Sequence, residues 1–155
     1  MIIRRLVSLL LQEVMIVVQV TVNVDLGGLS EKLSQFPEAK TKGMEYATQE
    51  MVRTLMMNSP VDHGLLKSWF IESMTEDEAH IKTPADYALE VNYGTRPHFI
   101  YPSNKKMLYW EGAEHPVPFV VHPGTSPTLF IENSIEDVEG RLDGYFLKAL
   151  EEVMG

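Results

Sequence analysis

The sequence predicts an α+β fold in which a small antiparallel β-sheet packs against a long helix and a C-terminal helix, with a proline-rich extended arm. Apolar residues alternate strictly from Val18 to Leu26, which is typical of a half-buried strand. Residues 38–58 and 131–153 carry apolar stripes of helical period. Between these stripes lies a segment with repeated prolines: Pro97, Pro102, Pro116, Pro118 and Pro123. Proline donates no ladder hydrogen bond, so this segment is expected to form short edge strands and ordered loops.

The N-terminal half supplies one strand and two helices. Gly27 and Gly28 end the strand, and residues 29–36 are predicted as a short helix that stops at Pro37. The following helix, residues 38–58, buries a stripe made by Met44, Ala47, Met51 and Leu55. It ends near Ser59, because the residue before Pro60 is pushed away from helical angles.

A hairpin and a last helix complete the predicted domain. One strand runs through Trp69 and Ile71, residues 75–78 form a turn, and residues 79–82 pair back as the second strand. The stripe over residues 131–153 predicts one amphipathic helix. Gly140 and Gly144 weaken that helix by about 1 kcal/mol each relative to alanine, so packing must hold it.

Residues 1–14 form an N-terminal extension to a single domain spanning residues 15–155. The Arg4–Arg5 pair before an apolar run imitates a signal peptide, but residues 6–11 are too short an apolar run and no small-residue cleavage site follows. A membrane-spanning helix needs about 20 apolar residues. Met15 is an alternative start, in which case residues 1–14 form a short helix or lie on a neighbouring molecule.

The composition favours an ordinary globular protein and disfavours several functional classes. The formal net charge of −9 repels phosphate, so tight nonspecific binding of nucleic acid is not expected. With no cysteine, a disulfide framework and a thiolate metal site are both excluded. Several serines lack the context of a catalytic nucleophile, so no enzymatic activity or catalytic residue is predicted: Ser59, Ser68, Ser126 and Ser134.

A short phrase, Gly-Thr-x-Pro, occurs twice, at Gly94–Pro97 and at Gly124–Pro127. Glycine permits a positive φ, threonine closes a local turn, and proline makes the exit extended. Each copy is therefore predicted to be a corner, and the two corners bracket a protruding arm at about residues 94–131. A histidine stands beside each copy, at His98 and at His122.

Two alternative functions remain open at this point. A metal-dependent hydrolase would use His98, His115 and His122, with Glu90 or Glu114 as a further ligand. No pair of these histidines has the spacing of a zinc motif, so no metal ligand is assigned. A nucleic-acid-binding module would use the aromatic and basic residues of the arm: Tyr101, Lys105, Lys106, Tyr109 and Trp110. Aromatic residues among prolines also suit a protein interface, which we consider the better interpretation.

A series of short motifs resembles one protein family. The motifs are Pro60-Val61-Asp62-His63-Gly64, Tyr87-Ala88, Gly94-Thr95-x-Pro97-His98, Ile100-x-Pro102, and His122-Pro123-Gly124-Thr125-x-Pro127. From about Met15 to Leu150, the chain is similar to the tail-component, or tail-completion, family of long-tailed bacteriophages and prophages. Members of that family are neck proteins that join the tail to the DNA-filled head. The resemblance implies neither catalytic residues nor a cofactor.

The resemblance implies a structural virion protein, assembled in the host cytoplasm and located at the neck, at the top of the tail. It implies a homo-oligomeric ring, sixfold by analogy, that contacts the head–tail connector and the tail-tube or tail-terminator proteins. DNA would pass through the lumen without specific binding, and no membrane would be contacted. The predicted interface residues lie in the arm: Gly94, Thr95, Pro97, His98, Phe99, Tyr101, Lys106, Tyr109, Trp110, Phe119, His122, Gly124 and Thr125.

Overall fold

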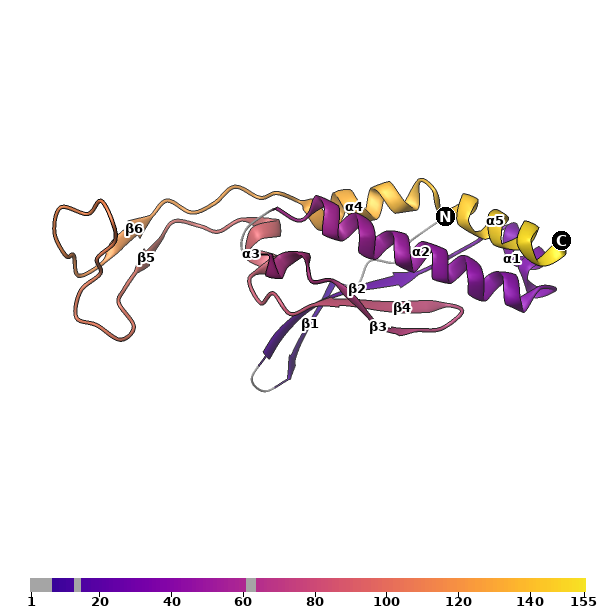
Figure 1. Ribbon diagram of the computed structural model, residues 1–155, viewed down its shortest axis with the longest axis horizontal. Helices are drawn as coiled ribbons and strands as arrows, with labels where there is room; N and C mark the ends of the chain where they lie inside the picture. Colours follow the sequence, from indigo (N-terminus) through magenta and orange to yellow (C-terminus); the bar gives the residue numbers. More distant parts are fainter. Residues whose placement is uncertain (1–6, 13–14, 61–63) are drawn as a thin grey trace. The chain divides into compact units, whose positions relative to one another are not determined.

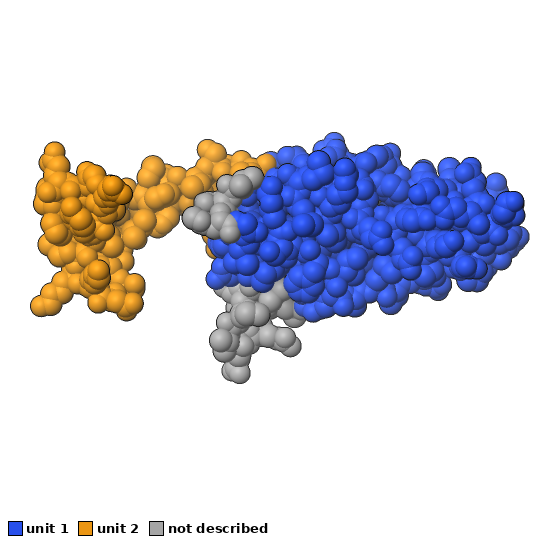
Figure 2. Space-filling model, in the orientation of Figure 1, with its two compact units in different colours: residues 1–88, 129–155 blue, residues 89–128 orange. Residues whose placement is uncertain are grey.

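The computed structural model describes residues 7–12, 15–60 and 64–155. The chain divides into two compact units, which Figure 2 shows in different colours. Residues 1–88 and 129–155 form the first unit, here named the body, and residues 89–128 form the second, here named the arm. A single domain was predicted from the sequence, with an arm at about residues 94–131.

A four-stranded antiparallel sheet forms one layer of the body (Figure 1). Its strands are Val7–Gln12 (β1), Met15–Asn23 (β2), Phe70–Met74 (β3) and Glu78–Thr83 (β4), in the spatial order β1-β2-β4-β3. The predicted burial of the apolar face of β2 is confirmed, because Val18, Val20 and Val22 are all buried. Two parts of the prediction are wrong: the strand ends at Asn23 and not at Leu26, and the polar face is buried as well. On the opposite face, Gln19 and Thr21 lie 2.8 and 3.2 Å from Nδ1 of His80.

The N-terminal residues differ from their prediction. The described residues Val7–Gln12 form β1, which pairs antiparallel with β2 from Val7 opposite Val20 to Gln12 opposite Met15. The alternative of a short helix is therefore wrong for this segment. Residues 7–11 read Val-Ser-Leu-Leu-Leu, and a short apolar run of this kind has no period that separates a strand from a helix. Backbone pairing with β2 decides the outcome.

The helices of the described chain are Leu29–Ser34 (α1), Pro37–Asn58 (α2), Leu65–Lys67 (η1, a 3₁₀ turn), Ala88–Tyr93 (α3), Phe130–Glu139 (α4) and Leu142–Met154 (α5). All residues of α3 but the first belong to the arm. Within the body, α2, α4 and α5 form the second layer and lie on one side of the sheet (Figure 1). The stripe Met44, Ala47, Met51 and Leu55 of α2 is fully buried, as predicted. The short helix predicted over residues 29–36 ends earlier, at Ser34, and Pro37 instead begins α2, where its missing N–H costs no hydrogen bond. None of the helices in the described part of the chain combines the length and apolarity that a membrane crossing requires.

The predicted C-terminal helix is in fact two helices. α4 ends at Glu139 and α5 begins at Leu142. Between them, Arg141 has φ −114° and ψ 2°, and its N–H donates to the carbonyl of Val138, three residues back. Gly140 lowers the cost of this break. Both helices still bury their apolar stripes, which is why the periodicity looked continuous.

Close packing joins α2 to the C-terminal helices. A side chain at Gly43 of α2 would overlap the ring of Phe146 in α5, so glycine allows these helices to approach closely. Nearby in the core, the indole of Trp69 donates to Oγ of Ser59 over 3.1 Å and meets Phe130 edge-on, with ring centroids 6.3 Å apart. These contacts make the body a packed two-layer unit.

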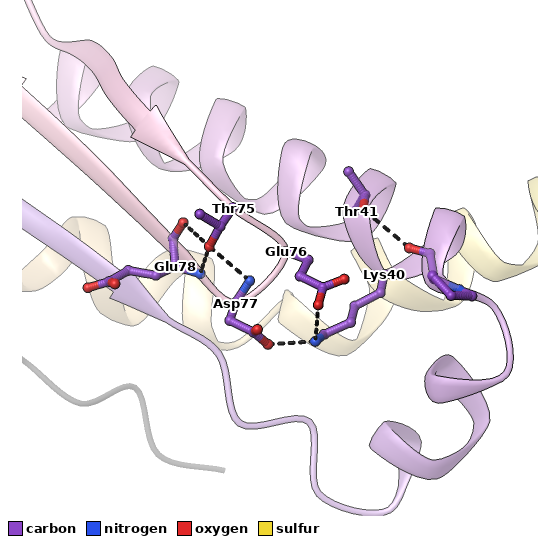
Figure 3. A network of polar contacts seen from close by, with 7 residues as sticks. Lys40, Thr41, Thr75, Glu76, Asp77 and Glu78 are labelled. Carbon is purple, nitrogen blue, oxygen red and sulfur yellow. Dashed lines mark hydrogen bonds and ion pairs between the residues drawn. The ribbon is translucent and has the colours of Figure 1, made fainter.

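The β3–β4 turn confirms the predicted hairpin and is tied to α2 (Figure 3). The N–H of Thr75 donates to the carbonyl of Glu78 over 2.7 Å, which closes the turn. Nζ of Lys40 lies 2.5 Å from Asp77 and 3.6 Å from Glu76. The hydrogen bond to Asp77 raises the pKa of Lys40 above its ordinary value. The hairpin is therefore attached to α2 by ion pairs, and to the rest of the sheet by the pairing of β4 with β2.

Candidate interaction surface

The two Gly-Thr-x-Pro phrases pair with each other at the base of the arm. Each threonine N–H donates to the carbonyl of the other threonine over 3.1 Å, and the two hydroxyl oxygens of Thr95 and Thr125 lie 3.2 Å apart. Gly94 and Gly124 have φ of +72° and +85°. A side chain on either glycine would overlap the carbonyl oxygen of the opposite threonine. We name Gly94, Thr95, Gly124 and Thr125 the clasp; it explains why the phrase occurs twice.

Beyond the clasp, the arm is a two-stranded antiparallel ribbon. Its strands are His98–Ile100 (β5) and Val120–His122 (β6), in which His98 lies opposite His122. The same register runs from the clasp into the ribbon, so Pro97 lies opposite Pro123. Neither proline can donate a hydrogen bond, which leaves a gap in the ladder between the clasp and the ribbon.

One face of the ribbon is made of aromatic and aliphatic side chains. Because side chains alternate along a strand, Phe99 and Val121 share a face, and Tyr101 and Phe119 continue it. The three rings contact each other, with Phe99 and Phe119 edge-on at 5.5 Å and Tyr101 at 6.2 and 6.0 Å from them. All four side chains are exposed, from 45% for Phe119 to 64% for Tyr101. We name these four residues the aromatic face.

The opposite face carries the two histidines. Their rings lie 5.1 Å apart, tilted by 32°. Nδ1 of His98 lies 2.9 Å from the Arg96 carbonyl, which only accepts, so that nitrogen carries the proton. Nδ1 of His122 accepts from the Gly124 N–H over 3.1 Å, so the proton of the neutral ring is on Nε2. His122 thus ties its strand to Gly124 of the clasp, while His98 bonds to Arg96, the residue that follows the clasp.

These histidines bear on the alternative of a metal-dependent hydrolase. The residues that the structure describes contain no group of three or more His, Asp or Glu side chains placed to hold a metal ion. His98 and His122 come together, but no such group unites them with His115, Glu90 or Glu114. No metal ligand is assigned to the arm.

The tip of the arm has its own turn. Leu108 and Val117 exchange two backbone hydrogen bonds of 2.7 and 2.9 Å, and the Ala113 N–H donates to the Trp110 carbonyl over 3.0 Å. Tyr109 and Trp110 are 68% and 50% exposed. A pocket of about 330 Å³ opens beside this turn, and its lining residues are Pro102, Ser103, Asn104, Lys105, Met107, Leu108 and Tyr109. Lys106 is exposed in the same segment.

The structure thus sorts the predicted interface residues into distinct roles. The clasp holds the base, Pro97 stands in the ladder gap, the histidines occupy one face, and Phe99, Tyr101 and Phe119 occupy the other. Tyr109 and Trp110 lie at the tip, in a register that differs from the ribbon's. Sequence reasoning missed Val121, whose alternation with Phe119 was the available signal.

The arm has no interior of its own. All of residues 89–128 are described, and no apolar side chain among them is buried. The buried residue of the arm is Asn92. Because isolated two-stranded ribbons are marginally stable in water, the aromatic face is a surface suited to a partner.

Comparison with known proteins identifies no relative. No protein-family model matches the chain, and neither the curated proteins nor the solved structures contain a match to it.

Proposed function

We propose that this chain is a structural virion protein of a tailed phage, which assembles into a closed ring at the head–tail junction. The observation that carries the proposal is the arm: an extended, proline-bearing ribbon that exposes an aromatic face and buries no apolar side chain. Aromatic anchors that are already in contact with one another lose little entropy on docking. The resemblance of the sequence motifs to the tail-completion family supports the same function.

The charge distribution also supports this proposal. The formal net charge of −9 disfavours a grip on DNA, as a lumen through which DNA passes requires. A closed ring needs heterologous contacts, in which one surface of each copy meets a different surface of its neighbour. The arm supplies one such surface. Its other contacts would be with the connector on the head side and with the tail-tube or tail-terminator protein.

Two experiments test the proposal. The direct one images virions that carry the labelled protein, and we expect the label at the neck. A label confined to the host cytoplasm would contradict the proposal.

The second experiment deletes residues 105–115 at the tip. The body should remain folded, because these residues make no part of its core, while rings and infectious virions are lost. A point variant on the body surface, Leu147→Ser, is the matched control, since that side chain is 47% exposed.

The nucleic-acid alternative has its own measurement. Lys105 and Lys106 are exposed beside Tyr109 and Trp110, and a binding site there predicts affinity for DNA that falls steeply with salt. We expect no shift of a DNA fragment at low salt. A shift that disappears in a Lys105→Gln, Lys106→Gln variant would instead favour the nucleic-acid module.

A further inference from the structure

Strand β3 is an edge of the body sheet that exposes apolar side chains. Among the described strands it pairs only with β4. Phe70 and Ile71 are 48% and 40% exposed. Further along, a bulge between Ile71 and Ser73, with the charged Glu72, disrupts the edge and guards it against pairing. Before the bulge, Ile71 lies opposite the buried Ile81, on the core face of the sheet. Phe70 lies opposite Lys82, on the other face, where its ring is available to another molecule.

The arm is the complementary feature in the same chain. Its aromatic face is apolar, exposed and preformed, and no part of the arm has a buried apolar side chain to stabilise it. Each copy thus presents one apolar ribbon face and one exposed aromatic ring, that of Phe70, at a sheet edge. Both are surfaces that natural proteins cover.

Charge indicates which molecule covers them. The arm carries three acidic and three basic side chains, so its formal charge is zero and the net charge of −9 lies on the body. Two bodies in contact would repel each other. A neutral arm can meet the acidic body of a second copy without that repulsion, so copies can associate head to tail through arm and body.

We propose that the ribbon of one copy lies along β3 of a second copy, with its aromatic face covering Phe70. The inference rests on the proposed function for its head-to-tail order, since each copy then gives its arm to one neighbour and receives an arm from the other. Such a contact is heterologous, and it generates a closed ring when the rotation that relates one copy to the next brings the last copy back to the first. The partner is thus a second copy of this chain.

The test uses three variants of the full chain. The arm variant, Phe99→Ser with Phe119→Ser, removes two rings of the aromatic face. The edge variant, Phe70→Lys, places a charge where the ribbon would lie. The control, Leu147→Lys, places the same charge on α5 at a side chain of nearly equal exposure, 47% against 48%. Circular dichroism checks that each variant keeps the helical signal of the native chain.

Sedimentation of the purified proteins over a concentration series gives the result. We expect the native chain and the control to associate, while the arm variant and the edge variant each stay monomeric. An equal mixture of the two defective variants should then form a dimer and nothing larger. The arm variant keeps an intact edge and the edge variant keeps an intact arm, so one contact can form between them.

Other results overturn the inference. If the edge variant alone still associates, arms pair with arms; if the mixture stays monomeric, the two surfaces are not partners. A native chain that stays monomeric at every concentration also overturns it. Imaging of virions distinguishes failure of this inference from failure of the proposed function. If the edge variant occupies the neck as the native chain does, the arm contacts a different virion protein. A labelled chain absent from virions, but forming the mixed dimer, defeats the proposed function alone.

Discussion

The body and the arm solve the problem of stability in different ways. The body buries large apolar side chains from both of its layers, including Met44, Ile81 and Phe146, each with no exposed surface. The arm, in its 40 residues from 89 to 128, buries no apolar side chain and relies on a glycine clasp, two short strands and prolines. A hydrophobic core makes one unit independent of its surroundings. The other is shaped by backbone constraints, which hold an exposed aromatic surface in place.

The largest contrast should appear when one aromatic ring is removed from each unit. Phe146→Ala leaves a cavity against Gly43 and should lower the free energy of unfolding of the body by about 3–5 kcal/mol. Phe99→Ala, in the arm, should change it by less than about 0.5 kcal/mol, because that ring is already 56% exposed.

Urea unfolding measures both values. Trp69 is buried in the body and Trp110 is exposed in the arm, so a Trp110→Phe background makes fluorescence report on the body alone. Leu147→Ala, on the exposed side of α5, controls for loss of helix contacts. An equal loss from Phe99→Ala and from Phe146→Ala would refute the distinction between the two units.

A second, smaller effect should be confined to the arm. Gly124→Ala and Gly112→Ala both place a side chain at positive φ, +85° and +91°, which costs about 1–2 kcal/mol. Only at Gly124 would the new carbon also overlap the carbonyl of Thr95, whereas the space at Gly112 is open.

Hydrogen exchange of the Thr95 and Thr125 amides detects the difference. We expect Gly124→Ala to speed their exchange by more than about tenfold, since each 1.4 kcal/mol corresponds to a factor of ten. Gly112→Ala should leave these two amides unchanged, and neither variant should alter the unfolding of the body. If both variants speed the exchange of these amides equally, the clasp does not depend on the close approach of its two backbone segments.

The smallest effect should come from the charged contact of the β3–β4 turn. Lys40→Ala should lower the free energy of unfolding by at most about 1 kcal/mol at neutral pH, because the ion pair is partly exposed. The folded chain raises the pKa of Lys40, so this contribution is complete below the unfolded value of 10.5 and is lost as the pH rises through the raised value. The native chain and the variant should therefore converge at strongly alkaline pH. Lys105→Ala, in the arm, should have no effect at either pH.

Local patterns predicted most of the body but not its interruptions. The alternation in β2, the stripe of α2 and the β3–β4 hairpin were all readable, because each depends on neighbours within a few residues. The break between α4 and α5 at Arg141 could not be predicted, because two helices that bury one continuous stripe have the periodicity of a single helix. Pairing of Val7–Gln12 with β2 was also hidden, since an apolar run of that length suits either structure.

The sequence by itself determined that the chain has an α+β body and that residues between the two Gly-Thr-x-Pro phrases form an unusual, proline-bearing segment. It also determined the excess of negative charge. Only the tertiary structure decided that the two phrases clasp each other, and that Phe99, Tyr101, Phe119 and Val121 share one exposed face. The reason is that register across an antiparallel pair joins residues some 20 to 30 positions apart, and no periodicity within one strand specifies that pairing.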